Sequence, residues 1–564
     1  MLRESAIGGR MRSTKITLLA FLISISLIAQ TATAEPLSQE PDRVLYQVYV
    51  ESFKDGSVNL GRPTGSGNFE GLKDSLEYLK DLGVTGLLLM PIFRSGGMGY
   101  IPDDFFEIRQ DYALESEPGK RDQAFRQLTR AAHESGIKIF LDAPINHISR
   151  YSEWFKMSAK NEFGMGDWFL WSPEPLLGWR RPWQPDGKPS DVWHWDGTRN
   201  GFFYGLFSDA MPDLNHRNPK VIDTFNAFFS KYAELGADGF RIDAARHLVE
   251  GETNLENAHP DNLAQLRAYL NTVRKNFPDQ SFILEIWAGH HDIDPYLPVA
   301  GDVALDFPYM EGIRASLKGK HPYGIRNILK HIEGTQDRIT AGNRVIFMGN
   351  HDIPRIRTFV ENEKERVELS TALTLSLPET PLLYYGDEIF MPGDYIREKD
   401  NSTKVNEVCT PMAWHSGPNA GFTDPSITLG NDWNRKLHDN WQELNVESQS
   451  RLGDSLLNLV KRLTRARKLL SIDNRTRIRV APQHDSDPVL TVAMTFADGS
   501  CSVGVYNFSP APQNGRSISI PGICEDSHTS SPLISRRATI REEWGNRFLD
   551  LSGYGFLWIR HSGI

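Results

Sequence analysis

Short apolar runs along the chain alternate with longer stretches in which apolar residues recur at helical spacing. The first run extends from Val44 to Val50, is rich in β-branched and aromatic residues and ends at Glu51, which is typical of a strand. The run from Val84 to Pro91 is apolar throughout, as expected of a strand buried on both faces of a parallel sheet. Helices are predicted over 71–82, 121–135 and 456–470.

Six further apolar runs complete a set of eight predicted strands. They are Ile137 to Asp142, Asp238 to Asp243, Ser281 to Ile286, Val303 to Phe307, Arg344 to Gly349 and Pro381 to Tyr385. Strands that alternate with helices indicate a parallel sheet, and eight of them close a (β/α)8 barrel. The sequence therefore predicts an α/β fold, a TIM barrel with two additions.

The two additions are predicted where this alternation fails. Residues 147–215 are rich in Trp, Gly and Pro and too long for a plain loop, so we expect an excursion domain after the third strand. Alternating apolar and polar positions from residue 472 indicate a C-terminal antiparallel β domain over 472–564. This leaves 35–146 and 216–471 for the barrel, with an irregular stretch at 391–445.

The charge and the N-terminus bear on partners and localisation. A chain of 564 residues with net charge -10 and pI ≈ 5.9 is not expected to bind nucleic acid or an anionic membrane. Four basic residues within the first 15 precede an apolar run over 16–28, and Ala32-Thr33-Ala34 offers a cleavage site. This predicts a signal peptide over 1–34, a periplasmic or extracellular protein, and no membrane attachment after its removal. An uncleaved anchor is the alternative, although the run is short for a membrane span.

The three cysteines are unevenly distributed. Cys501 and Cys524 lie in the same C-terminal segment and could pair, whereas Cys409 stands apart. An exported protein with three cysteines keeps at least one of them out of its intramolecular disulfides.

Polar side chains gather at the predicted ends of four strands. Arg241 and Asp243 are two residues apart, so on a strand they point to the same face. An arginine beside a carboxylate lowers its pKa and keeps it ionised, although a structural ion pair is the simpler interpretation. The other three strand ends carry Asp142 with His147, Glu285, and His351 with Asp352. A barrel would bring all four ends to one mouth, which favours a functional site over independent ion pairs.

These strand ends resemble the signature segments of the α-amylase family of retaining glycoside hydrolases, and the resemblance covers most of the chain after the signal peptide. Further matching segments are Met211-Pro212-Asp213-Leu214-Asn215, Tyr385-Gly386-Asp387-Glu388, Pro411-Met412-Ala413-Trp414 and Asn419-Ala420-Gly421-Phe422. The last two resemble a region of the oligosaccharide-acting members. Each string is short, but their order along the chain makes the resemblance specific.

The resemblance implies catalytic roles for three carboxylates. Asp243 matches the nucleophile, Glu285 the general acid/base, and Asp352 the third carboxylate, which would bond sugar hydroxyls and favour a distorted ring. Retaining hydrolysis uses one carboxylate to form a glycosyl-enzyme and a second, about 5 Å away, to protonate the leaving oxygen. Glu285 should therefore have a raised pKa.

The resemblance also implies substrate-binding positions, for each of which a merely structural role is the alternative. They are Tyr100, on which the reacting sugar would stack, His147 and His351, which would bind its hydroxyls, Arg246 and His247, which would contact the sugar beyond the scissile bond, and Arg241. Asn146 matches a position that binds calcium in many amylases, so calcium binding and simple ordering of the loop both stay open. The loop 55–59 lacks the acidic run of a strong calcium site.

Four positions depart from the family pattern. Gly97 stands where exo-acting glucosidases carry an Asp that binds the terminal sugar, and Ile101 stands where an Asp often follows the stacking Tyr. Cys409 replaces an Arg. Pro144 replaces a Val, and a proline cannot donate to a strand ladder. Taken with Arg246-His247, which resembles a basic pair of α-amylases, these departures leave endo and exo action open.

We therefore expect an exported retaining hydrolase of α-1,4-glucosidic bonds in an α-glucan, either maltooligosaccharides or starch fragments, that acts through a glycosyl-enzyme on Asp243. One alternative is a transglycosylase or isomerase of α-glucosides, in which a sugar rather than water attacks the intermediate. A second is a non-catalytic carbohydrate-binding relative. Loss of one of the three acids would mark that relative, and all three are present.

Overall fold

The eight predicted strands close into a parallel barrel in the computed structural model. It describes residues 43–255, 259–297, 301–398, 403–430, 436–470, 472–524, 530–544 and 546–561, so the predicted signal peptide lies outside the described residues. The strands are β1 (Leu45–Val48), β2 (Gly86–Leu89), β5 (Lys138–Ala143), β9 (Gly239–Ile242), β10 (Ser281–Leu284), β11 (Val303–Leu305), β12 (Arg344–Phe347) and β13 (Thr380–Tyr384). Their order around the barrel is β1-β13-β12-β11-β10-β9-β5-β2, which confirms the predicted TIM barrel.

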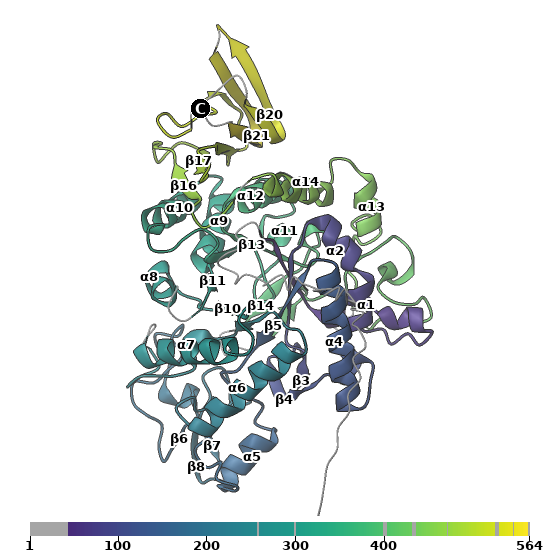
Figure 1. Cartoon of the computed structure of the whole chain (residues 1–564), viewed down its shortest axis with the longest axis vertical. Helices are drawn as coiled ribbons and strands as arrows, with labels where there is room; N and C mark the ends of the chain where they lie inside the picture. The colour runs from purple at the N-terminus through teal and green to yellow at the C-terminus, as the bar shows by residue number, and fades with distance from the viewer. Residues whose placement is uncertain are drawn as a thin grey trace, which may run out of the picture. The chain divides into compact units, whose positions relative to one another are not determined.

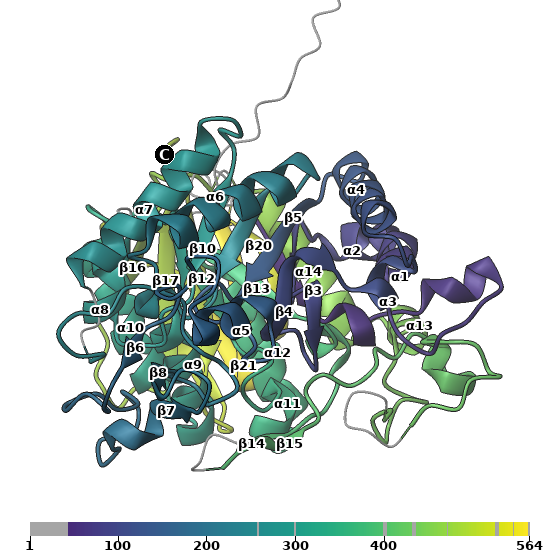
Figure 2. The same cartoon turned by 90° about the horizontal axis from the view of Figure 1, so that it is seen from below.

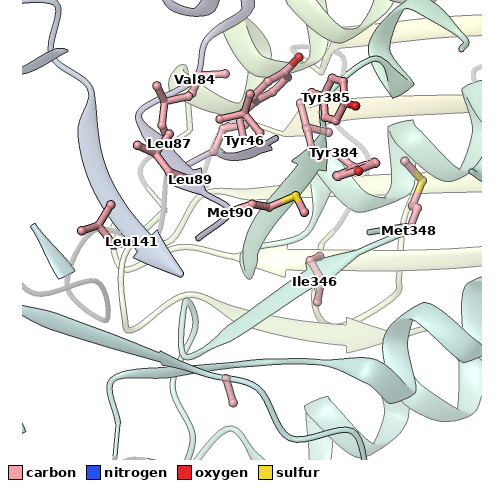
Figure 3. Close-up of a cluster of buried hydrophobic side chains, with 14 of the residues drawn as sticks. Tyr46, Val84, Leu87, Leu89, Met90, Leu141, Ile346, Met348, Tyr384 and Tyr385 are labelled. Carbon is pink, nitrogen blue, oxygen red and sulfur yellow. The ribbon is translucent and has the colours of Figure 1, made fainter. Parts of the chain in front are cut away.

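Successive residues of the barrel strands, β9 excepted, belong to two different apolar clusters. One cluster takes Leu45, Leu88, Phe140, Val345 and Leu382. The other takes the next or preceding residue of the same strands together with residues of the surrounding helices. Because adjacent side chains on a strand point to opposite faces, the first cluster fills the barrel and the second lies between strands and helices. Figure 3 shows part of the second cluster, on β1, β2, β5, β12 and β13.

Helices surround the barrel, as Figures 1 and 2 show. The longer ones are α4 (Pro118–Glu134), α6 (Pro219–Glu234), α7 (Pro260–Arg274), α9 (Phe307–Gly319), α10 (Tyr323–Thr335), α12 (Lys364–Ser376) and α14 (Leu456–Lys468). The shorter ones are α3 (Gln110–Ala113), α5 (Glu153–Lys160), α8 (His290–Ile293), α11 (Ile356–Phe359) and α13 (Val446–Arg451). The helix predicted over 71–82 is instead two, α1 (Phe69–Asp74) and α2 (Leu76–Leu82). They are separated at Ser75, which leaves helical geometry while its hydroxyl donates to the Gly71 carbonyl.

Three small sheets lie among the barrel connections. The hairpin of β3 (Phe93–Gly96) and β4 (Ile101–Ile108) follows the second barrel strand. Within 147–215, β6 (Trp171–Ser172), β8 (Gly201–Tyr204) and β7 (Trp193–Asp196) form an antiparallel sheet. The irregular stretch 391–445 contains a hairpin of β14 (Tyr395–Arg397) and β15 (Thr403–Asn406).

The C-terminal part is an antiparallel sheet, as predicted. It contains β16 (Arg477–Val480), β17 (Val489–Thr495), β18 (Cys501–Asn507), β19 (Gln513–Arg516), β20 (Ser531–Glu543) and β21 (Asn546–His561). Cys501 and Cys524 form a disulfide. The exact domain limits given above stay predictions. None of the helices in the described ranges has the length and apolar character that spanning a bilayer requires.

Candidate active site

One buried arginine joins the ends of three neighbouring barrel strands. Arg241, near the end of β9, directs Nη1 at Asp142 Oδ1 (2.6 Å) and Asp243 Oδ1 (2.7 Å), and Nη2 at Glu285 Oε1 (2.6 Å). Asp142 is the last residue but one of β5, and Glu285 follows β10 directly. Because β5, β9 and β10 are adjacent in the barrel, two carboxylates that lie 42 positions apart in sequence share one guanidinium.

Three carboxylates around one guanidinium, one buried and two partly buried, leave an excess of negative charge. Burial raises the pKa of Glu285 to about 7 and that of Asp142 to about 6, while Arg241 acts in the opposite direction. Burial also raises the pKa of Asp243. We expected Arg241 to lower the pKa of Asp243, and this expectation was wrong in its net direction, because Arg241 is shared and burial outweighs it.

The surroundings of Asp243 and Glu285 distinguish the two acids. A hydrogen bond from Glu285 favours the ionised form of Asp243, whereas nearby Asp243 and Asp352 both raise the pKa of Glu285. The backbone N–H of Ala244 donates to Glu285 Oε2 (3.0 Å). Ala244 adopts the left-handed conformation (φ 48°), a strained geometry for a non-glycine residue that is common at functional sites. Burial and the two neighbouring carboxylates therefore favour a proton on Glu285, while the Ala244 N–H opposes this rise in its pKa.

Tyr100 lies in the turn between β3 and β4 and reaches the carboxylate cluster. Its hydroxyl donates to Asp142 Oδ2 (2.5 Å), and its ring stacks on His351 with the centroids 4.8 Å apart. His147 is buried, and its Nε2 bonds to the backbone carbonyl of Tyr100 (2.8 Å). Burial lowers the pKa of His147 to about 4, so this ring is neutral and holds the Tyr100 turn in place.

Asp352 and His351 follow β12. His351 Nε2 lies 3.2 Å from Asp352 Oδ2, and its Nδ1 lies 3.3 Å from the Gln47 amide nitrogen. Burial lowers the pKa of His351. Gln47 can only donate through that nitrogen, so Nδ1 accepts and Nε2–H donates to Asp352. Arg397 approaches Asp352 Oδ1 from the β14–β15 hairpin at 3.6 Å.

Arg246 and His247 lie in the short turn after β9. Arg246 Nε donates to His247 Nε2 (2.8 Å), and His247 Nδ1 bonds to Glu250 Oε1 (2.9 Å). His247 is buried, which keeps its pKa well below the usual value. His247 therefore supports Arg246, which is itself only half-buried.

With this geometry established, comparison with known proteins decides the family. The catalytic-domain model described as "Alpha amylase, catalytic domain" matches residues 47–473. The chain belongs to the α-amylase family.

Curated relatives within the α-amylase family include transferases. A 4-alpha-glucanotransferase of Thermotoga maritima is 32% identical over 431 residues, which are 75% of this chain and 86% of the relative. A trehalose synthase/amylase of Mycolicibacterium smegmatis is 32% identical over 472 residues, 75% of each chain.

Solved structures agree on the fold. An alpha-amylase from H. orenii superposes with a TM-score of 0.75 at 26% identity, covering 92% of this chain and 99% of that one. The trehalulose synthase MutB superposes with a TM-score of 0.77 at 21% identity and the same coverage, which supports the fold alone.

The side chains at the calcium position of the α-amylase family supply only part of a calcium site in this protein. Asn146 Nδ2 donates to Asp213 Oδ2 (2.9 Å), and Asp213 Oδ1 accepts from the Leu206 N–H (2.9 Å). Both carboxylate oxygens thus already accept N–H hydrogens, whereas Ca²⁺ takes six to eight oxygen ligands. Among the described residues no group of three acidic, His or Cys side chains could hold a metal. Asn146 Oδ1, however, is buried and has no hydrogen-bond partner among the described residues, so it is available as one oxygen ligand, and a calcium ion would take its remaining ligands from backbone carbonyls or water. Calcium binding stays a prediction, and the proposed mechanism does not involve a metal.

The loop carboxylate Asp55 is also fully engaged. It accepts hydrogen bonds from the backbone of Gly65 (2.8 Å) and Thr64 (3.0 Å) and from the Thr423 hydroxyl (2.7 Å), among others. A carboxylate saturated with N–H and O–H donors orders its loop and has no lone pair left for an ion.

The departures from the family pattern have separate structural consequences. β5 ends at Ala143, so Pro144 lies just beyond the strand and removes no ladder bond. Cys409 is buried beside the Tyr384 hydroxyl (3.2 Å) and Met98 Sδ (3.6 Å). Burial raises the pKa of its thiol to about 12, so it is inert. Gly97 has φ 57° and no neighbour where a Cβ would lie.

Three residues to which no role was assigned from the sequence join the site. Asp142 was expected at the mouth, as a carboxylate at a predicted strand end, but no function was assigned to it. Gln47 could also have been noticed in the sequence, because it is a polar residue within an apolar predicted strand. The structure shows that it is buried. Arg397 carries none, because the irregular stretch that contains it has no periodicity.

Proposed function

We propose that this protein is a retaining α-glucosidic hydrolase acting on α-1,4-linked maltooligosaccharides or starch fragments. The observation that supports it best is that Asp243 and Glu285 share one guanidinium, where burial raises the pKa of Glu285 to about 7. Retaining hydrolysis needs one ionised and one protonated carboxyl beside the same bond. The family membership restricts that bond to the chemistry of glycosides.

In the first step, an Asp243 oxygen attacks the anomeric carbon while Glu285 transfers its proton to the glycosidic oxygen. The bond between that carbon and the leaving oxygen breaks, the leaving sugar departs as an alcohol, and a glycosyl ester forms on Asp243. Asp352, held by His351 and Arg397, is placed to bond hydroxyls of the distorted sugar. Arg241 stays fixed by Asp142, so the nucleophile keeps its direction.

In the second step, the ionised Glu285 takes a proton from water and the water oxygen attacks the anomeric carbon. The ester bond breaks, Asp243 recovers its charge and the sugar leaves with its original configuration. Two inversions at one carbon give net retention.

A transglycosylase is the second candidate, supported by the 4-alpha-glucanotransferase and trehalose synthase/amylase among the relatives. The only change is in the second step, where a sugar hydroxyl takes the place of water. The half-buried Arg246 follows Ala244, whose N–H bonds to the acid/base, by two residues, and we propose that it binds such an acceptor.

A time course with maltotriose separates these candidates. Hydrolysis raises the number of reducing ends and gives only shorter products. Transfer between 4-hydroxyls keeps that number constant and gives longer chains, whereas isomerisation gives an isomer of the same mass. Absence of all products, with maltotriose still bound, would support the non-catalytic relative instead.

We also propose that the protein is exported to the periplasm or beyond. The basic and apolar N-terminal segment supports it, and so does the Cys501–Cys524 disulfide, because disulfides persist in oxidising compartments. N-terminal sequencing of the native protein is expected to begin at Glu35. A native chain that begins at Met1 would contradict the proposal.

A further inference from the structure

The loop that carries Glu285, here called the acid loop, extends over residues 285–290 from the end of β10 to the beginning of α8. On the β9 side the backbone holds it, because the Glu285 N–H donates to the Ile242 carbonyl (3.0 Å) and the Ala245 N–H donates to the Glu285 carbonyl (3.1 Å). On the β11 side the strand pairing ends at Leu284, opposite Ala304. On that second side, side-chain contacts take over.

The first of these contacts is exposed to solvent. The Trp287 ring stacks on Phe307 with the centroids 4.6 Å apart, and its Nε1–H donates to Glu311 Oε1 (3.2 Å). Trp287 is 47% exposed, and Glu311 is exposed as well. Water competes for an exposed hydrogen bond, so this contact fixes the acid loop only weakly.

The second contact is buried. His290 Nε2 lies 2.9 Å from Asp306 Oδ1 and 3.0 Å from Asp306 Oδ2, and the two side chains are 7% and 0% exposed. Asp306 directly follows β11. Its N–H donates to the Val345 carbonyl on β12 (2.8 Å), and its Oδ1 accepts from the Tyr309 N–H at the beginning of α9 (2.9 Å). Asp306 is therefore fixed to the barrel wall, and His290 joins the end of the acid loop to it.

The neighbouring groups determine how His290 and Asp306 bond. Burial raises the pKa of Asp306, but the hydrogen bond from His290 and the charge of Arg344, 3.6 Å away, hold it below its usual value. The ionised carboxylate can only accept, so His290 Nε2 carries the hydrogen. His331 stacks on the His290 ring with the centroids 4.3 Å apart and is itself held by Asp294 (3.0 Å). Both the plane of the His290 ring and its bonding direction are thus set.

An anchor five positions after Glu285 restricts where the acid can lie. A general acid must come within hydrogen-bond reach of the oxygen that it protonates, and a displacement of about 1 Å can cost a hundredfold in rate. The bonds of His290 and Asp306 are directed at α10, α9 and β12, so this pair acts on the substrate only through the acid loop.

We propose that His290 and Asp306 are positioning residues, whose buried hydrogen bond holds the acid loop so that Glu285 meets the glycosidic oxygen. This rests on the proposed function, in which Glu285 protonates the leaving sugar. Asp243 does not depend on this anchor, because Arg241 holds it on β9. Loss of the bond should therefore impair protonation and spare the attack by Asp243.

The first experiment removes the bond with His290→Ala and restores it with His290→Gln, whose amide nitrogen can donate from a position close to that of Nε2. Maltopentaose needs a proton on its leaving oxygen, whereas fluoride leaves α-glucosyl fluoride without one. We expect the Ala variant to lose about ten- to a hundredfold in kcat/KM on maltopentaose and the Gln variant to recover most of it. The kcat/KM on α-glucosyl fluoride should be nearly unaffected in both.

Two results of this experiment would overturn the proposal. Equal losses on both substrates would mean that His290 supports the whole mouth and not the acid in particular. A parent-like kcat/KM of the Ala variant on maltopentaose would mean that the acid loop needs no anchor.

The control is a second histidine–aspartate pair. His133 Nε2 lies 2.8 Å from Asp238 Oδ2, and this more exposed pair joins α4 to the residue before β9, at the opposite end of the strands from Glu285. His133→Ala should leave kcat/KM on both substrates at the parent value. A loss confined to maltopentaose, as large as that of His290→Ala, would show that the effect is not specific to the acid loop and would overturn the proposal.

Asp306→Asn tests the pair from its other side. It keeps an acceptor for the Tyr309 N–H but removes the charge that His290 faces, so it should give the same substrate pattern at a smaller size. A parent-like kcat/KM on maltopentaose, or an equal loss on α-glucosyl fluoride, would contradict the proposal even if His290→Ala is too unstable to isolate.

The outcomes separate the positioning proposal from the proposed function. If the parent cleaves neither α-glucosyl fluoride nor maltopentaose, the proposed function fails. If it cleaves both, and Glu285→Gln loses activity on maltopentaose alone while the His290 and Asp306 variants do not, the positioning proposal fails and the function stands.

Discussion

The mouth of the barrel and the contact between α12 and the C-terminal sheet both bury carboxylates against arginines, but in opposite ratios. At the mouth, three carboxylates share Arg241. At the other contact, Glu368 alone takes Arg536 (2.7 Å) and Arg537 (2.5 Å). Burial acts on the pKa of both groups in the same direction, yet the pKa of Glu285 is raised and the pKa of Glu368 is lowered.

The ratio of cations to anions therefore decides what a buried carboxylate does. With two arginines, burial of Glu368 is more than offset, the carboxylate stays ionised and the pair joins two parts of the molecule. At the mouth, three acids share the positive charge of one arginine. That charge does not offset the burial of all three, and one of them keeps a proton near neutrality. A proton that is held only weakly can be donated in catalysis.

The largest expected effect is the loss of the nucleophile. Asp243→Asn keeps the shape of the mouth but cannot form the glycosyl-enzyme, so we expect kcat to fall about 10⁴-fold. Steady-state kinetics on maltopentaose measure this, with circular dichroism to check that the fold is kept. A variant that hydrolyses at the parent rate would show that the mouth is only structural, like the Glu368 contact.

The next effect tests the proton on Glu285. In the parent, kcat/KM should fall as the pH rises through about 7, because Glu285 must be protonated and its pKa is about 7. Glu285→Gln should lower kcat/KM about 10³-fold on maltopentaose and abolish that alkaline limb. α-Glucosyl fluoride needs no protonation to leave, so its first step should be nearly unaffected, and an equal loss on both substrates would contradict the acid role.

At the other contact, the same kind of substitution should affect stability and not activity. Glu368→Gln leaves two arginines without their counter-charge, and we expect the free energy of unfolding to fall by about 3 kcal/mol with kcat unchanged. Because the folded pKa of Glu368 is lowered, its contribution is present above the unfolded pKa and is lost as the pH falls through the folded value. Denaturant titrations at pH 7 and pH 3 should show the parent and the variant converging at the lower pH.

The smallest expected effect concerns the influence of Asp142 on Asp243, which shares Arg241 with it. Asp142 raises the pKa of Asp243, so Asp142→Asn should lower the pKa of Asp243. The acid limb of kcat/KM should then move to lower pH by about one unit or less. Asp209→Asn removes the same charge from an exposed position and should leave the limb in place. A shift to higher pH would mean that Asp142 acts mainly by positioning Arg241.

Much of the fold could be predicted because strand and helix patterns are local. The eight apolar runs gave all eight barrel strands; six are shorter than predicted, and β5 and β13 are shifted by one residue. Ser75 was missed as a helix break, since a hydroxyl that bonds to a carbonyl four residues earlier leaves no trace in the pattern. The loop hairpins were not predicted, because their strands are too short to show alternation.

The sequence by itself determined which acids and histidines the strand ends carry, and their spacing determined that Arg241 and Asp243 share a face. Only the tertiary structure decided that Asp142 and Glu285 reach the same guanidinium. It also decided that burial outweighs this arginine, and that His290 at the end of the acid loop meets Asp306. The reason is that desolvation and charge competition depend on distances between segments far apart in the chain, and no local pattern encodes those distances.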